Sequence, residues 1–223
     1  AARKALLRQS GLLPVAGPGD AEFATLDDEV QALLATVRTF GEPASRSLRI
    51  THGGVRLSGE IDGVTATCLL RSRVATLKAK DQLAAWIVHV VVAIARHAGE
   101  TWPAETIVVA RDQAIRLQAL TADDAARALD TLLAGYRAGL TAPLPFFPAT
   151  SSAWAEASSD PAAADRKART KWQPRHNMTG ASDSENRDHM LCFRQRDPLA
   201  TAEFRDWAGR VFHAMAPHTR SLS

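Results

Sequence analysis

Asp62 is the residue whose type and position most clearly suggest catalysis, because it ends a segment in which apolar and polar residues alternate as in a β-strand. A carboxylate in such a place can bind a divalent metal ion, and bound metal ions catalyse the cleavage of phosphodiester bonds. That chemistry also needs an acidic residue on the next strand, followed two positions later by a lysine that steadies the attacking hydroxide. The next strand therefore decides whether this chemistry is available.

The next predicted strand lacks both groups. Residues 66–73 read Ala-Thr-Cys-Leu-Leu-Arg-Ser-Arg, and no acidic residue occurs between Gly63 and Lys80. One carboxylate cannot hold the metal ion alone, and an arginine cannot replace an acidic ligand. We therefore expect no catalytic residue and no metal site, with Asp62 left as a degenerate remnant. The Asp-Gly turn that it begins also accounts for its presence.

Two alternatives stay open. A working metal nuclease could recruit Asp27, Asp28 or Glu29 from a predicted helix to the side of Asp62, and Asp62→Ala would then abolish cleavage that depends on Mg²⁺ or Mn²⁺. The domain could instead bind only proteins, and its basic residues would then be ordinary solvated surface.

Other chemical signatures are absent or weak. The sequence holds no glycine-rich phosphate loop and no Gly-x-Gly-x-x-Gly, so we expect no cofactor in this domain. A loose group near the C-terminus lacks a second close pair of zinc ligands and is interpreted as scattered surface residues: His176, His189, Cys192, His213 and His218. His89 lies on an apolar helix and is interpreted as a hydrogen-bonded core or interface histidine.

Two groups of basic residues are the strongest remaining functional signal. The first comprises Arg71, Arg73, Lys78 and Lys80, and the second comprises Arg166, Lys167, Arg169 and Lys171, with Trp172 beside them. Such side chains neutralise phosphates without reading sequence and make affinity depend on salt. We predict that both groups bind DNA. The mildly basic balance, with a net charge of +3, permits this role.

The composition is that of a globular protein with a real core. The 223 residues are 46% hydrophobic and 23% charged, which allows one large domain or one domain with an appendage. The longest apolar run, residues 84–95, is about half of the roughly 20 residues that cross a bilayer, so no membrane partner is expected. Cys68 and Cys192 fit no metal or redox spacing and are expected to be reduced thiols of a cytoplasmic protein.

Hydrophobic periodicity predicts a mixed α/β domain. The expected elements are a helix capped by Thr25, a three-stranded meander over Ser47–Arg71 with a turn at Gly53-Gly54, an apolar helix over Lys78–His97, strands over Ile107–Ala110 and Ile115–Leu117, a helix capped by Thr121, an extended segment over Pro143–Pro148 and a final helix over Pro198–Ala216. This order resembles a restriction-endonuclease-like, or PD-(D/E)XK nuclease-like, core that is catalytically degenerate and carries extra helices.

The predicted division of the chain has four parts. Residues 1–24 are a lead-in from a preceding domain, and residues 25–150 form the nuclease-like α/β core. Residues 151–190, rich in serine, alanine and charge, form a partly ordered insert. Residues 191–223 contain a C-terminal helix that packs back on the core.

Two stretches carry a more specific resemblance. Residues 77–86 read Leu-Lys-Ala-Lys-Asp-Gln-Leu-Ala-Ala-Trp, and residues 132–148 end in Pro-Leu-Pro-Phe-Phe-Pro. Together they resemble the RecC C-terminal domain family, which belongs to the gamma chain of exodeoxyribonuclease V. The similarity spans about Leu6 to Pro148 and is weaker beyond.

This resemblance implies a nuclease-like domain that has lost its catalytic residues, although Gln82 and Trp86 keep a spacing found in active relatives. It implies a place in a RecBCD-type ATP-dependent helicase–nuclease that acts in double-strand-break repair and recombination. RecB-like and RecD-like subunits and DNA would be its partners. Such a domain would scaffold the motor subunits and guide or split DNA strands, while the partner subunits would use ATP and Mg²⁺.

Overall fold

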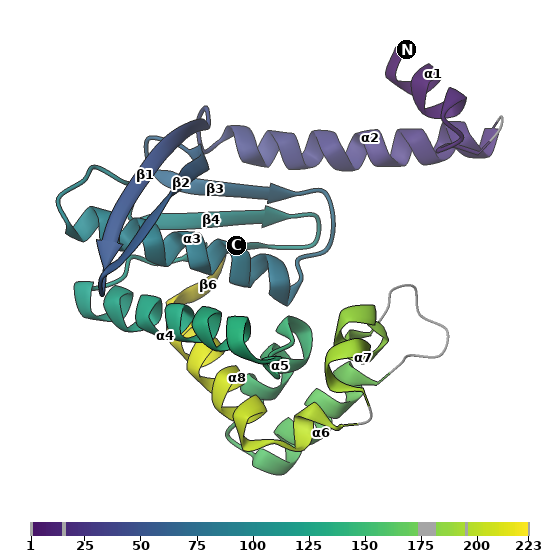
Figure 1. Cartoon of the computed structure of the whole chain (residues 1–223). Coiled ribbons are helices and arrows are strands. Elements are labelled where there is room, and N and C mark those ends of the chain that lie inside the picture. The colour runs from purple at the N-terminus through teal and green to yellow at the C-terminus, as the bar shows by residue number, and fades with distance from the viewer. Residues whose placement is uncertain (1, 15–16, 174–181, 195, 223) are drawn as a thin grey trace.

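The computed structural model describes residues 2–14, 17–173, 182–194 and 196–222. These residues form a mixed α/β domain around one six-stranded sheet (Figure 1), as the sequence predicts. The strands are β1 (Ala44–His52), β2 (Val55–Val64), β3 (Cys68–Arg73), β4 (Glu105–Ala110), β5 (Ala114–Leu117) and β6 (Thr219–Leu222). The α-helices are α1 (Ala2–Gln9), α2 (Gly17–Arg38), α3 (Ala79–His97), α4 (Ala122–Thr141), α5 (Pro148–Ala155), α6 (Pro161–Trp172), α7 (Arg187–Phe193) and α8 (Ala202–Met215).

The strands lie across the sheet in chain order, from β1 to β6. Each neighbouring pair is antiparallel except β3 and β4, which run parallel with Cys68 opposite Glu105 and Arg73 opposite Ala110. A parallel pair needs a crossover connection, and α3 supplies it between these two strands. The predicted meander, the apolar helix and the strands that follow it are therefore confirmed.

Helices cover both faces of the sheet at this parallel pair. On one face α2 packs against alternate residues of β3 and β4: Cys68, Leu70, Ile107 and Val109. On the other face α3 and α4 pack against the intervening residues, which include Leu69 and Val108. A strand that is buried on both faces must be apolar along its length, which explains the run Cys-Leu-Leu at the start of β3.

The first half of α2 extends beyond the sheet and projects from the domain together with α1 (Figure 1). Asp20 in the first turn of α2 forms ion pairs with Lys4 and Arg8 of α1, which join the two helices. Hydrogen bonds from these two side chains lower the pKa of Asp20 below its usual value. The two helices thus form a hairpin that ion pairs at Asp20 hold together.

The predicted start of this helix at Thr25 is wrong, because α2 already begins at Gly17. The Thr25 hydroxyl donates to the carbonyl of Ala21 at 3.1 Å, one turn back inside the helix, and so does not cap it. Pro18 is compatible with this earlier start because a proline in the first turn removes no helical hydrogen bond.

Two glycine positions shape the meander. Gly53 and Gly54 have φ angles of +53° and +76°, so the predicted tight turn between β1 and β2 is confirmed. At the other end of β2, Gly63 has a φ angle of +75°, and a Cβ atom there would lie 2.1 Å from the carbonyl oxygen of Leu70. Only glycine lets β2 approach β3 so closely at this point.

The C-terminal helices pack around the fully buried Phe147. Its ring centroid lies 4.5 Å from that of Trp172, 5.4 Å from that of Phe193 and 6.4 Å from that of Phe204. The preceding segment is extended as predicted, but Pro148 opens α5, a position that suits proline. The described residues of 151–190 are largely helical, and α8 returns to the core as expected.

Replacing Gly63 by alanine tests the close approach of β2 and β3. We expect Gly63→Ala to lower the free energy of unfolding by about 1–3 kcal/mol or more, because the left-handed backbone and the contact with Leu70 both oppose a Cβ atom. Urea unfolding measures the loss. The matched control is Gly59→Ala on the same strand, where a Cβ atom meets nothing within 4 Å. An equal loss in both variants would contradict this explanation.

Candidate nucleic-acid interface

The carboxylate of Asp62 is exposed near the end of β2 and accepts a 2.6 Å hydrogen bond from the hydroxyl of Ser45. The adjacent strand β3 presents Leu69 and Arg71 on one face, where the metal chemistry would need an acid and a lysine. Among the described residues no group of three or more histidine, cysteine, aspartate or glutamate side chains is placed to hold a metal ion. Asp62 therefore has a hydroxyl partner and belongs to no such group among the described residues.

The rival carboxylates on α2 are not beside Asp62. Glu29 pairs with Arg111 at 3.4 Å, just beyond the end of β4, while Asp27 and Asp28 are exposed. Asp62 lies near the start of β3, where Val64 pairs with Leu69. Because β3 and β4 run parallel, these two places are at opposite ends of the strands. The geometry brings no α2 carboxylate to Asp62.

The first basic group lies where β3 ends and α3 begins. Arg73 forms an ion pair with Asp81, and the other carboxylate oxygen of Asp81 accepts a 3.0 Å hydrogen bond from the backbone nitrogen of Lys78. This arrangement fixes the start of α3 and occupies Arg73. Lys78 and Lys80 are exposed and have no ion pair with any described residue, while Arg71 is partly buried. The two lysines are therefore the accessible cations of the group.

The second basic group lies on α6. Arg169 pairs with Asp197 at 2.7 Å, whereas three other cations have no ion pair within the described part of the chain: Arg166, Lys167 and Lys171. These three side chains and Glu156 line a groove of about 450 Å³ between α5 and α6. The groove presents three cations against one acid.

Helix α5 connects the two basic groups. Glu156, which follows α5, lines the α6 groove and also a smaller pocket of about 200 Å³ that contains Gln82 of α3. Gln82 follows the first basic group in sequence, and it shares the smaller pocket with Glu156, which also lines the groove of the second group. In Figure 1 α5 lies between the sheet layer and α6. The accessible cations therefore belong to neighbouring parts of one domain.

His89 is a core residue, as the sequence predicts. Its Nε2 atom donates to the carbonyl of Gln118 at 3.0 Å, and its Nδ1 atom accepts from the hydroxyl of Thr106 at 2.9 Å. Both partners suit the neutral imidazole, and only 2% of the residue is exposed. Burial lowers the pKa of His89 to about 4.

The histidines near the C-terminus have separate partners. His189 donates through Nδ1 to the carbonyl of Asp183 at 2.7 Å, His213 lies 2.9 Å from the hydroxyl of Ser158, and His218 stacks on Trp86. His176 lies outside the described residues, and Cys192 is a free, exposed cysteine. Three tryptophans that could have anchored a partner are instead part of the core: Trp86, Trp102 and Trp207.

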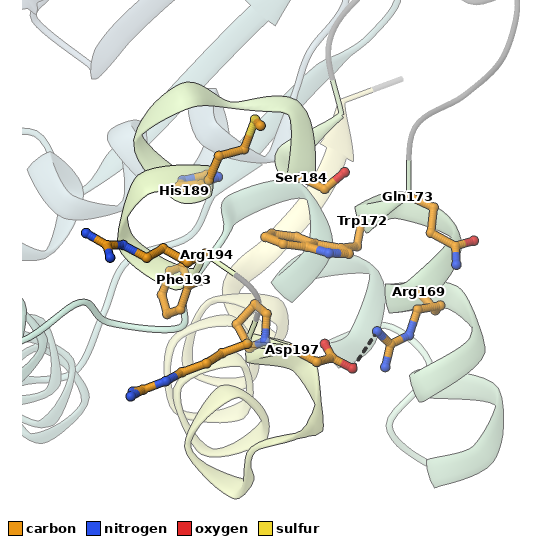
Figure 2. Close-up of a pocket in the computed structure, with 11 residues that line it drawn as sticks. Arg169, Trp172, Gln173, Ser184, His189, Phe193, Arg194 and Asp197 are labelled. Carbon is orange, nitrogen blue, oxygen red and sulfur yellow. Dashed lines mark ion pairs between the residues drawn. The ribbon is translucent and has the colours of Figure 1, made fainter.

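A pocket that sequence patterns do not reveal lies between α6 and α7. It has a volume of about 420 Å³, and Figure 2 shows Trp172 across its middle, between His189 of α7 and Asp197. Arg194 and Arg196 also line it. The lining residues come from two stretches, 169–173 and 184–198, that follow no known motif, so the sequence pattern alone does not group them.

The fold and these surfaces define an α/β domain that presents accessible cations near its sheet and along its C-terminal helices. A family model described as the RecC C-terminal domain matches residues 1–159. Because this match covers more than half of the chain, the chain belongs to the RecC C-terminal domain family. The resemblance that residues 77–86 and 132–148 carry is confirmed.

The chain is also similar to the RecBCD enzyme subunit RecC of Escherichia coli (strain K12). The two are 28% identical over an alignment of 202 residues, and the match covers 86% of this chain and 18% of that relative. The chain thus spans less than a fifth of the relative's length. No helix among the described residues has the length and apolar character needed to cross a membrane.

The buried His89 makes stability depend on pH. The unfolded chain binds a proton near the ordinary pKa of 6.5, but the folded protein does so only near 4. The contribution of the neutral His89 to the free energy of unfolding is therefore fully present above pH 6.5 and is lost as pH falls from there toward 4. We expect His89 to contribute a loss of about 2 kcal/mol between about pH 7 and about pH 5.

Urea unfolding of the natural chain and of His89→Gln at the two pH values measures this contribution. The difference in stability between the two proteins should shrink on acidification, because glutamine binds no proton. His97→Gln, a change at an exposed histidine of the same helix, is the control and should follow the natural chain. An unchanged difference between the natural chain and His89→Gln would contradict the assignment.

Proposed function

We propose that this chain is a non-catalytic domain of the RecC subunit of a RecBCD-type helicase–nuclease, in which it guides DNA strands and binds partner subunits. Membership of the RecC C-terminal domain family supports the assembly. The observation that carries the non-catalytic role is the surroundings of Asp62, which accepts a hydrogen bond from Ser45 and belongs to no group of three or more potential metal ligands within the described residues.

The topology supports descent from a restriction-endonuclease-like core. An antiparallel meander, a crossover helix and a fourth strand parallel to the third are the arrangement expected for such a core. Asp62 occupies the place of its first metal ligand. Leu69, which has no exposed surface, lies on β3 where an acidic ligand would be desolvated. The domain thus retains the scaffold of this class without its ion-binding residues.

The accessible cations support a role in DNA binding. Lys78, Lys80, Arg166, Lys167 and Lys171 have no ion pair within the described ranges, so their charges are available to phosphates. Contacts of this kind are independent of base sequence, which suits a surface along which strands of any sequence must pass. Arg73 and Arg169 have acidic partners and are expected to contribute less.

The contact surface for RecB-like and RecD-like subunits would come from exposed apolar residues rather than from the core tryptophans. Tyr136 and Leu140 are 66% and 68% exposed on successive turns of α4, and Leu6 and Leu12 are 64% and 71% exposed near the projecting hairpin. Large exposed apolar side chains are typical of sites where proteins associate. We propose that the motor subunits cover these two areas.

Binding of forked DNA at increasing salt tests the DNA role. We expect the affinity to fall linearly on a log–log plot of binding constant against NaCl, because each neutralised phosphate releases counterions. Lys78→Ala/Lys80→Ala and Lys167→Ala/Lys171→Ala should each weaken binding and reduce that slope by about 1–2. Fluorescence anisotropy of a labelled fork measures both quantities.

Arg56→Ala/Arg137→Ala is the control, because it removes the same charge from exposed positions outside both groups. It should leave the slope nearly unchanged. Equal affinity at low and high salt would overturn the DNA role. An equal effect of the control and the two lysine pairs would show that net charge, rather than these surfaces, governs binding.

A further inference from the structure

The pocket between α6 and α7 combines aromatic rings with cations. It is lined by Trp172, His189 and Phe193, by three arginines and by Asp197 (Figure 2). Its volume of about 420 Å³ is within the range of roughly 300–1,000 Å³ that small-molecule sites occupy. It lies beyond residue 159, where the match to the family model ends.

We propose that this pocket binds one nucleobase of single-stranded DNA, with the adjoining phosphates on Arg194 and Arg196. The proposal rests on the proposed function and adds to it the form of DNA and the place of contact. It makes the domain a point of attachment for a separated strand.

Trp172 is the stacking surface. The indole is partly exposed, and behind it the buried Phe147 lies 4.5 Å away between ring centroids and holds it in place. The His189 ring is nearly parallel to the indole, at 22° and 6.2 Å. Aromatic rings held in this way stack on bases of any identity, which is how proteins bind single strands without reading sequence.

The cations are distributed so that charge remains for a phosphate. Arg169 is neutralised by Asp197 at 2.7 Å. Arg194 and Arg196 are exposed, and neither has an ion pair with another described residue. His189 donates through Nδ1 to a backbone carbonyl, which leaves its Nε2 atom as the nitrogen that can meet a ligand. The lining therefore keeps a net positive charge beside the indole.

The backbone at the end of α7 places these arginines. Arg194 has a φ angle of +46°, and no other non-glycine residue in the described part of the chain has a positive φ. Its backbone nitrogen donates to the carbonyl of Met190 at 2.9 Å and closes the helix. Residues in such sparsely populated conformations are concentrated at ligand clamps. Here the turn brings the arginine side chains to the pocket.

The other side of α6 extends the path of the strand. The groove that contains Arg166, Lys167 and Lys171 lies on the opposite side of the helix from Arg169 and Trp172. Surfaces that bind single strands generally combine a basic groove with stacking rings, and a strand with a base in the pocket would cross α6 to reach this groove. In a duplex the bases are already paired and stacked, so only a separated strand can place a base in the pocket without the cost of extruding it.

Comparison of two strands with equal numbers of phosphates tests the proposal. The probes are a fluorescein-labelled oligothymidylate and an abasic strand of the same length, bound to the whole 223-residue chain. We expect the oligothymidylate to bind about tenfold more tightly, because only it has bases to stack. Trp172→Leu should remove most of this preference and leave affinity for the abasic strand nearly unchanged.

Arg194→Gly/Arg196→Ala should weaken the binding of both strands several-fold. Glycine at position 194 suits the positive φ angle, so we expect this variant to fold. Arg56→Ala/Arg137→Ala is again the charge control. If Trp172→Leu does not fold, ultraviolet crosslinking of a strand with 5-iodouracil replaces it, and attachment should map to Trp172 or His189.

Equal affinity for the two strands, or a base preference that remains in Trp172→Leu, would overturn the proposal that the pocket binds a base. So would crosslinks that map only elsewhere. If the chain still binds forked DNA in a salt-dependent manner under those outcomes, the DNA-guiding function stands without this site. Failure to bind any DNA would overturn both. An acidic peptide that displaces oligothymidylate as effectively as unlabelled strand would show a purely electrostatic, protein-directed surface instead.

Discussion

The parallel pairing of β3 with β4, covered by α2 on one face and by α3 and α4 on the other, is the constraint on which the rest of the domain depends. It removes both faces of these strands from water, so the start of β3 must be apolar. A carboxylate in place of Leu69 would be buried and would need a metal ion or a cation as partner. In this chain a leucine fills that position of the core instead. Basic residues appear only where β3 emerges, at Arg71 and Arg73.

The sheet layer and the C-terminal helices form two parts of the domain with different surfaces. The sheet and its covering helices form the base of the domain, and the C-terminal helices pack on it through α5 and α8. Around Phe147 those helices form a second, smaller apolar cluster that orients α6. The accessible cations and the mixed aromatic–basic pocket lie on this attached layer and at its junction with α3. The sheet and its covering helices therefore support the layer that presents these cations.

Most of the sheet follows from local patterns. Alternation over residues 47–71 and the two glycines at 53 and 54 predict the meander, since period and turn chemistry agree. The start of α2 does not follow, because Gly17-Pro18-Gly19 is typical of a loop and the helix there is supported by the contact with α1. β6 has no period of its own and pairs with β5 only through the fold. For the site, the basic groups are visible as clusters, but which cations are neutralised depends on distant acids such as Asp197.

We propose that the surface beside Asp62 cannot hold a divalent ion and that the domain binds DNA without cutting it. Anomalous diffraction from crystals soaked in manganese chloride tests it most directly, because Mn²⁺ marks its own position. We expect no ordered ion within coordinating distance of the Asp62 carboxylate, and an intact hydrogen bond from Ser45. An ion bound by Asp62 together with a second acidic side chain would contradict it.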